Sequence, residues 1–381
     1  MQCPRCMNTD QEYFYHGSRG WYCRRCISFG RALIEEEKEA VSLKEIPAGS
    51  EEYILQYPLT QAQARIASAC AQYVKSGDIL LHCACGAGKT EIVVQSIAEA
   101  LKERKKVCFA IPRRQVVLEL RERLAQYFPH ARVIAVCGGH TAETDGDLII
   151  CTTHQLYRYY QAFDLLILDE PDAFPYKDNA VLHGIAASAC RGHRIYLTAT
   201  PDAELKDMKE KGIITELVLN RRPHGHPLPV PQIHTGFHLF LLIRLVRWTR
   251  QHRDHPRMVF VPTIAAAEGL GRFLCLFDKC MICTSRTENR DEVIERFRSC
   301  GNGLIVCTSI LERGVTVSGT DVAVYNADHA VFDEASLIQI AGRAGRSFQK
   351  PDGDVLFLCR TKSSLAEKCR RQLEEANRCA V

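Results

Sequence analysis

The sequence predicts an α/β protein with two domains built on mostly parallel sheets, preceded by a small cysteine-rich module. Short apolar runs alternate with amphipathic helical stretches from residue 57 onward, one proline-rich segment interrupts the alternation, and two C-x2-C pairs lie in the first 26 residues. Such alternation is typical of βα units. The 381 residues also exceed the roughly 250 to 300 at which single hydrophobic cores stop growing, so more than one domain is expected.

The composition excludes several classes of protein. With 46% hydrophobic residues, 25% charged residues and a net charge of +4, the chain has the balance of an ordinary globular protein and not of a disordered or collagen-like one. No apolar stretch approaches the ~20 residues that span a bilayer, and the first residues do not resemble a signal peptide. We therefore expect a cytoplasmic protein. The small positive charge neither requires nor excludes a nucleic-acid partner.

Residues 1–31 form the cysteine-rich module. Its cysteines follow the pattern C-x2-C-x16-C-x2-C, typical of a tetrahedral zinc site with thiolate ligands, and they are Cys3, Cys6, Cys23 and Cys26. A segment this small cannot hold a core of its own, so bound Zn²⁺ would supply its folding free energy. A redox-active pair is the alternative, but two pairs at this spacing favour the metal.

The rest of the chain divides by charge and by proline content. Residues 32–56 carry seven Glu and two Lys between Glu35 and Glu52, and we expect a solvated helix and linker there. The first α/β domain is expected over residues 57–220, a proline-rich linker over 221–234 and the second domain over 235–381. The strand candidates are residues 79–82, 107–111, 133–136, 148–151, 165–168 and 195–197, then 258–261, 303–307, 321–325 and 354–358.

A phosphate-binding sequence follows the first strand candidate. It reads Cys83-Ala84-Cys85-Gly86-Ala87-Gly88-Lys89-Thr90 and precedes a helical stretch. In such a turn the backbone N–H groups of Gly86, Ala87 and Gly88 point at phosphate oxygens. Lys89 would reach the terminal phosphates of ATP, and the Thr90 hydroxyl would bind Mg²⁺. The usual pattern begins with Gly, whereas this chain has a cysteine at that position.

A pair of carboxylates follows the apolar run 165–168. Asp169 would hold Mg²⁺ through water, and Glu170 would orient and polarise the attacking water. The order of the two motifs along the chain therefore predicts an ATP hydrolase.

From residue 59 to residue 346 the order of the motifs resembles that of superfamily 2 helicases, whose core consists of two RecA-like domains. The resemblance implies that Gln63, in Leu59-Thr60-Gln61-Ala62-Gln63, recognises adenine. The same residue would complete a capping box with Thr60 at the start of a helix, so both interpretations stay open.

The resemblance also implies contacts with nucleic acid in both domains. The matching residues are Arg114 and Thr153 in the first domain and Thr263 and Thr308 in the second. Leu197-Thr198-Ala199-Thr200-Pro201 resembles the motif that couples the ATP state to domain closure, although its threonines could equally cap a strand end. Many relatives carry an acidic residue after the Arg313-Gly314 pair, where this chain has Thr316.

The strongest match of the second domain is Gln339-Ile340-Ala341-Gly342-Arg343-Ala344-Gly345-Arg346. In the superfamily this stretch faces the nucleotide across the inter-domain cleft. The resemblance therefore implies that Gln339 belongs to the ATP site and that Arg343 and Arg346 are arginine fingers, which stabilise charge on the transferring phosphoryl group. ATP held by both domains would favour a closed cleft, and hydrolysis would open it.

A four-cysteine ribbon fused to a two-domain motor resembles the late competence ComFA family over nearly the whole chain. The resemblance implies a cytosolic ATPase, stimulated by single-stranded DNA, that helps to draw transforming DNA into the cytoplasm at the inner face of the cell membrane. The implied partners are single-stranded DNA, the competence DNA-uptake channel and a ComFC-like protein, and a homo-oligomer is left open.

Two other functions stay open at this point. One is a replication-restart helicase like PriA, or another DNA or RNA helicase. The other is a zinc-ribbon adaptor that no longer hydrolyses ATP. The role of the ribbon is open as well, because its aromatic residues with Arg24 and Arg25 could bind single-stranded DNA, pack on the motor or bind a protein.

Overall fold

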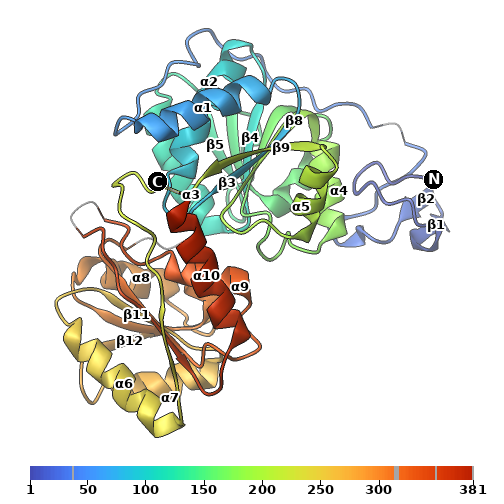
Figure 1. Ribbon diagram of the computed structural model, residues 1–381. Helices are drawn as coiled ribbons and strands as arrows, with labels where there is room; N and C mark the ends of the chain where they lie inside the picture. Colours follow the sequence, from blue (N-terminus) through green and yellow to red (C-terminus); the bar gives the residue numbers. More distant parts are fainter. Residues whose placement is uncertain (37, 313–316, 348–349, 380–381) are drawn as a thin grey trace. The chain divides into compact units, whose positions relative to one another are not determined.

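The computed structural model describes residues 1–36, 38–312, 317–347 and 350–379. The chain divides into two compact units. The first holds Met1–Cys83 and Gly88–Leu219, and the second holds Ala84–Ala87 and Asn220–Val381. Each unit contains one parallel sheet with helices packed against it (Figure 1).

The sheet of the first unit has seven parallel strands in the order β5-β6-β4-β7-β8-β3-β9. The strands are β3 (Asp78–Cys83), β4 (Val107–Ile111), β5 (Val133–Val136), β6 (Leu148–Thr152), β7 (Phe163–Asp169), β8 (Cys190–Thr198) and β9 (Ile214–Leu219). All six expected strands of this domain are present. The sequence pattern did not predict β9, an edge strand in which polar residues interrupt the apolar ones.

Helices cover both faces of this sheet, so its central strands β4 and β6 are buried at every position. The helices are α1 (Gln61–Tyr73), α2 (Lys89–Lys102), α3 (Arg114–Tyr127), α4 (Ala180–Ala189) and α5 (Ala203–Glu210), with the short 3-10 helix η3 (Thr153–Arg158). Right-handed crossovers along the observed strand order put α2 and α3 on one face and η3, α4 and α5 on the other. Helix α1 packs against α2 (Figure 1).

The N-terminal module is a small antiparallel hairpin of β1 (Phe14–Gly17) and β2 (Gly20–Cys23), flanked by the 3-10 helices η1 (Gln11–Tyr13) and η2 (Ile27–Phe29). The acidic segment that follows corrects one expectation, because its described residues between 35 and 52 form no helix. The backbone of segment 32–56 bonds to the rest of the first unit instead: the amides of Val41 and Ile54 donate to the carbonyl oxygens of Tyr160 and Tyr127. Closely spaced Glu residues and Pro47 also disfavour a helix there.

The second unit has a six-stranded parallel sheet in the order β10-β15-β14-β11-β13-β12. The strands are β10 (Gln232–Thr235), β11 (Arg257–Phe260), β12 (Cys280–Cys283), β13 (Leu304–Cys307), β14 (Asp321–Tyr325) and β15 (Val355–Cys359). The four expected strands are present, whereas the sequence pattern did not predict the two edge strands. Strand β10 overlaps the end of the proline-rich segment 221–234, so that segment is not a linker throughout its length.

The helices of the second unit also divide between the faces. They are α6 (His238–Gln251), α7 (Ile264–Leu274), α8 (Arg290–Ser299), α9 (Glu334–Ala341) and α10 (Ser364–Arg378), with the 3-10 helix η4 (Ser309–Leu311). By the same crossover rule α6 and α7 lie on one face and α8 and α9 on the other, with α10 packed against α9 (Figure 1). No helix in the described part of the chain is long and apolar enough to cross a membrane.

Candidate functional site

The glycine-rich loop connects β3 to α2 in the way that a phosphate site requires. Gly88 is the N-cap of α2, with a left-handed backbone (φ 80°), and a Cβ atom there would lie 2.5 Å from Nε2 of Gln63. Glycine is therefore needed for both its backbone and its lack of a side chain. Cys83 is the last residue of β3 and pairs with Leu219, so its backbone is extended and needs no glycine. Burial raises the pKa of the Cys83 thiol to about 12, which keeps it neutral.

The structure shows that Gln63 caps α1. Its Oε1 atom accepts a hydrogen bond from the Thr60 backbone amide at 2.9 Å. The backbone amide of Gln63 donates to the Thr60 hydroxyl at 3.3 Å, which completes the capping box. The side-chain nitrogen Nε2 of Gln63 lies beside Gly88, because a Cβ atom at Gly88 would be 2.5 Å from it. The cap thus holds the Gln63 side chain next to the phosphate loop.

A residue that no motif marks contacts the first turn of α2. The Arg123 guanidinium, from α3, donates to the Thr90 hydroxyl at 3.0 Å and lies 3.7 Å from a carboxylate oxygen of Glu91. Tyr127 donates to the same carboxylate at 3.1 Å. Because Arg123 carries a positive charge, its guanidinium would have to leave the Thr90 hydroxyl before that hydroxyl could bind a metal cation.

The two predicted catalytic carboxylates lie at the end of β7. Asp169 is the last residue of that strand, and Glu170 has a left-handed backbone (φ 53°) whose amide donates to the Leu197 carbonyl oxygen at 2.9 Å. Strands β3, β8 and β7 are consecutive and parallel, so the phosphate loop and the carboxylates leave the same edge of the sheet. A carboxylate and a hydroxyl are the hard oxygen ligands that Mg²⁺ prefers, so Asp169 and Thr90 suit this cation.

A third carboxylate links this strand end to the next one. Asp172 is buried and accepts hydrogen bonds from the hydroxyls of Thr198 and Thr200, the latter at 2.7 Å. The Thr198 hydroxyl also accepts the Thr200 amide at 2.9 Å. The threonines therefore cap the end of β8 and bind the carboxylate motif at the same time. The sequence motif includes Asp172, but sequence reasoning did not assign it a role.

The residues expected to contact nucleic acid are exposed to different degrees. Arg114 is exposed at the start of α3 and donates to the Gly138 carbonyl oxygen, and Thr263 is exposed as the N-cap of α7. Thr308 is partly exposed after β13. Thr153 is only 2% exposed and its hydroxyl is buried, so its contact with nucleic acid stays a prediction. Thr316 lies outside the described residues.

The arginine motif of the second unit follows α9. Gln339 and Arg343 are buried, and Arg346 is partly buried. The Arg343 Nε atom donates to the Glu312 carbonyl oxygen at 2.9 Å, and that of Arg346 donates to the Gly342 carbonyl oxygen at 2.8 Å. Both side chains are thus tied to backbone of the same unit.

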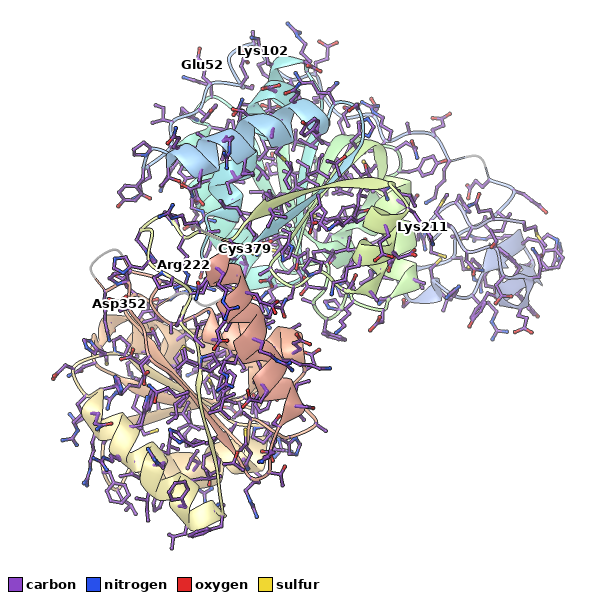
Figure 2. The ribbon with its side chains drawn as sticks, in the orientation of Figure 1. Glu52, Lys102, Lys211, Arg222, Asp352 and Cys379 are labelled. Carbon is purple, nitrogen blue, oxygen red and sulfur yellow. The ribbon has the colours of Figure 1, made fainter. Side chains whose placement is uncertain are left out.

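A buried arginine outside the motif supports this turn. Arg222, labelled in Figure 2, is 2% exposed and donates to the carbonyl oxygens of Gly342, Ala344 and Gly345 at 2.8 to 2.9 Å. Burial, and then the charge of Arg346, lower the pKa of Arg222 to about 10, so it remains charged at neutral pH. Sequence reasoning assigned its segment to a linker, and no pattern marks the residue.

The four cysteines of the N-terminal module come together as expected for a metal site. They are buried, and their Sγ atoms lie within 4.8 Å of one another. The Cys3–Cys26 and Cys6–Cys23 pairs have Sγ–Sγ distances of 3.7 and 3.8 Å. A tetrahedral Zn²⁺ with bonds of about 2.3 Å requires sulfurs about 3.8 Å apart, so the cluster fits this ion. The hydrogen bond between Cys26 and Cys3 lowers the pKa of Cys3 and raises that of Cys26, so the sulfur spacing is the observation that supports a metal.

The module is docked on the first unit. The Ser188 hydroxyl of α4 donates to the Pro4 carbonyl oxygen at 2.8 Å, and a Cβ atom on Gly184 would lie 1.8 Å from the Cys6 carbonyl oxygen. Phe29 packs on Tyr157 of η3, with ring centroids 5.3 Å apart. Part of the module's surface is therefore used for packing, one of the alternatives that the sequence left open.

Other aromatic residues of the module remain exposed. Tyr13 and Tyr15 are among its exposed apolar side chains. Arg25 lies over the Tyr13 ring at 5.1 Å and Arg24 over the Tyr15 ring at 5.7 Å. This surface offers aromatic faces and positive charge together.

Two family models match the chain. The model described as type III restriction enzyme, res subunit, matches residues 56–203, and the one described as helicase conserved C-terminal domain matches residues 238–348. Two curated relatives are similar over nearly the full length. Competence protein ComFA of Streptococcus pneumoniae (strain ATCC BAA-255 / R6) is 35% identical, with 99% of this chain and 90% of the relative covered. Competence protein ComFA of Bacillus subtilis (strain 168) is 34% identical, with 100% and 86% covered.

Solved helicase structures have a similar fold. Dbp5 of S. cerevisiae bound to RNA and ADP BeF3 has a TM-score of 0.63 at 15% identity, with 84% of this chain and 91% of that chain covered. RecG bound to a three-way DNA junction has a TM-score of 0.61 at 19% identity, with 90% and 49% covered. At these identities the likeness concerns the fold, and it confirms that each parallel sheet belongs to a RecA-like domain.

Proposed function

Because this chain belongs to the ComFA family of competence proteins, we propose that it is a motor that moves single-stranded DNA during the uptake of transforming DNA. Its superfamily 2 helicase domains make it an ATP-hydrolysing, helicase-type enzyme. To that activity the proposal adds single-stranded DNA as the substrate and the uptake of DNA into the cell as the biological task.

We assign the chemistry of ATP hydrolysis to the loops at the carboxyl edge of the first sheet. The backbone of Gly86–Gly88 and the Lys89 ammonium bind the phosphates, and Gln63, held beside Gly88, recognises the base. Glu170 orients and deprotonates the attacking water. Asp169 and Thr90 would hold Mg²⁺, which would supply positive charge to the phosphates. Arg343 and Arg346 stabilise the charge of the transferring phosphoryl group.

The observation that carries the proposal is the bonding of Asp172 to Thr198 and Thr200. Asp172 lies three residues after Asp169, so a change at the nucleotide can reach the end of β8 through two buried hydrogen bonds. We therefore assign these three residues to the coupling between hydrolysis and movement.

For the N-terminal module we propose a structural Zn²⁺ bound by its four cysteines. The sulfur spacing supports this ion. The exposed Tyr13 and Tyr15, each with an arginine over its ring, would stack on bases and neutralise phosphates of a strand. We further propose that the protein works beside the DNA-uptake channel at the inner face of the membrane, with a ComFC-like partner. The similarity to two ComFA proteins supports the competence context of this proposal.

ATP hydrolysis by the purified protein tests the proposed substrate. It should be measured without nucleic acid and then with single-stranded DNA, duplex DNA or RNA, at low and high salt, because phosphate contacts weaken with salt. We expect stimulation by single-stranded DNA at least about tenfold above that by the other two, and a loss of stimulation at high salt. The Lys89→Ala protein serves as the control for contaminating ATPases.

Each other outcome changes the assignment. A preference for RNA would move the protein to RNA metabolism, and equal stimulation by duplex DNA would favour a replication-restart helicase. No hydrolysis under any condition would leave an adaptor as the remaining function.

A further inference from the structure

The second unit has an apolar groove on the face opposite α8 and α9. Helices α6 and α7 form its walls (Figure 1), and it encloses about 450 Å³. Its apolar lining consists of Leu239, Leu242, Ile243 and Val246 from α6, with Phe273 from the end of α7 and Phe277 from the turn after it. Leu239 and Ile243 are 61% and 59% exposed, so solvent reaches apolar side chains that face away from the core. Exposed apolar surface of this kind marks interaction sites.

The charged residues that line the groove are arginines. Arg247 and Arg250 line it, Arg244 lies on the same helix, and α6 contains no acidic residue. Arg250 lies over the Phe277 ring at 5.3 Å, and Arg244 lies over the Phe240 ring at 5.4 Å. Two aromatic side chains thus hold guanidinium groups in position. None of the residues that line the groove in the described part of the chain is acidic.

The shape of the groove favours one kind of occupant. Leu239, Ile243 and Val246 follow one another at helical spacing, so the apolar floor runs along α6 for about 10 Å, nearly two turns of a partner helix. Both walls are helices, whose backbone groups are already bonded, so an added β-strand would find no partner. A symmetric contact with a second copy would bring like charges together.

We propose that this groove binds an acidic amphipathic helix of a partner protein. Apolar side chains of that helix, spaced at i, i+3 or i+4 and i+7, would fill the groove between Leu242 and Phe273. Its flanking carboxylates would pair with Arg247 and Arg250. The proposal concerns a surface without motif residues, so it does not depend on the proposed motor function.

A designed peptide tests the charge and the shape together. The probe is a fluorescein-labelled helix of about 18 residues with Leu at the three spacings and Glu beside them, and a matched peptide carries Lys in place of every Glu. Fluorescence anisotropy with the full-length protein should show that the Glu peptide binds at least about tenfold more tightly than the Lys peptide. A difference of this size in affinity corresponds to the gain of at least one ion pair.

Variants locate the binding surface. Arg247→Glu should reverse the preference between the two peptides, and Ile243→Asp should weaken the Glu peptide about tenfold or more. Arg272→Glu is the matched control, because Arg272 is exposed on α7 and already pairs with Glu268. It should leave both affinities unchanged. All three variants should hydrolyse ATP at the wild-type rate, which separates loss of binding from loss of folding.

Four results would overturn the proposal. Equal binding of the two peptides would remove the role of charge, and undiminished binding by Ile243→Asp would move the site elsewhere. Binding to vesicles of phosphatidylcholine and phosphatidylglycerol without binding to the Glu peptide would assign the face to a membrane. A dimer in sedimentation that Ile243→Asp dissociates would assign it to a second copy.

Discussion

The two parallel sheets hold their motif loops in different ways. In the first unit motif side chains bond to one another, since Asp172 accepts hydrogen bonds from Thr198 and Thr200. In the second unit the turn that carries Arg343 and Arg346 is held through its carbonyl groups by Arg222, a residue outside every motif. A motif whose parts bind each other can be found in a sequence, whereas a support that acts on backbone carbonyls leaves no pattern.

The second unit contains a second buried arginine with a similar role. Arg257, at the start of β11, is almost wholly buried and donates to the carbonyl oxygens of Thr249 and Asn302 and to the Asp278 carboxylate. Removing such a group would leave several buried acceptors without donors, and each costs about 1 to 3 kcal/mol. The fold of this unit therefore depends on a few single side chains.

The largest effect is expected when the chemistry of the first unit is removed. Glu170→Gln should lower kcat for ATP hydrolysis by at least about 100-fold, because the amide cannot accept the proton of the attacking water. Binding of a fluorescent ATP analogue should be retained. Glu210→Gln, at an exposed position of the same unit, is the control. Hydrolysis near the wild-type rate in Glu170→Gln would remove the assigned role.

Loss of Arg222, which holds the turn of Arg343 and Arg346, should have the next largest effect. Arg222→Met should lower kcat about tenfold or more while changing the KM for ATP less, because the turn with the proposed arginine fingers loses three hydrogen bonds. Its exposed neighbour provides the matched variant Arg221→Met, which should behave as wild type. Circular dichroism would confirm folding at the assay temperature. A lower Tm with unchanged kcat would show that Arg222 has only a structural role.

Asp172→Asn tests whether the bonds within the first-unit motifs couple the two activities. The Asn amide nitrogen donates where a carboxylate oxygen accepted, so one of the two threonine hydrogen bonds is lost or reversed, and the negative charge is removed. ATP hydrolysis without DNA should stay within a few-fold of wild type, whereas stimulation by single-stranded DNA should fall about fivefold to tenfold. Both rates come from the same coupled assay. Stimulation at the wild-type level would contradict the coupling role.

The sequence predicts that the motifs of the first unit lie at one edge of the sheet because each motif is local. The phosphate loop, the carboxylates and the threonine motif each follow a strand, and parallel strands bring their carboxyl ends to one edge. Cys83 is compatible with the loop because that position is extended. The capping box of Gln63 is also a local pattern, and the structure confirms it.

The remaining features depend on contacts between distant segments. Arg123 reaches Thr90 from another helix, and Arg222 reaches a turn 120 residues away in sequence. The burial of Thr153 follows from packing, which its motif does not reveal. Edge strands such as β12 are short and partly exposed, so their hydrophobic pattern is weak. The acidic segment bonds to the first unit instead of forming a helix, which composition cannot indicate.

A pair of glycine substitutions extends the comparison to stability. Gly184→Ala would put a methyl group against the Cys6 carbonyl oxygen, and we expect a loss of about 1 to 3 kcal/mol in unfolding free energy. Zinc release to a chelator should also become faster. Gly269→Ala, in α7 of the second unit, meets no atom within 4 Å and should be neutral or stabilising by up to about 1 kcal/mol. Equal stability changes would contradict the close docking of the module.

The smallest effect concerns His252 in the second unit. Hydrogen bonds to Asp321 and then to Asp354 raise its pKa to about 9, and Lys350 bonds to the same Asp321 carboxylate. Since the folded pKa exceeds the unfolded one, the stabilisation is present below about pH 6.5 and is lost as the pH rises through 9. The stability difference between wild type and His252→Gln should thus be about 1 to 2 kcal/mol near pH 6 and smaller near pH 10. A difference that is independent of pH would rule out the charged histidine.

The central claim is that ATP turnover at the edge of the first sheet moves the protein along single-stranded DNA. Displacement of streptavidin from biotinylated single-stranded DNA tests this claim directly, with the biotin at either end of the strand. We predict ATP-dependent displacement from one end only, and none with Glu170→Gln or with a non-hydrolysable ATP analogue. An absence of displacement while DNA still stimulates hydrolysis, or displacement by Glu170→Gln, would contradict the claim.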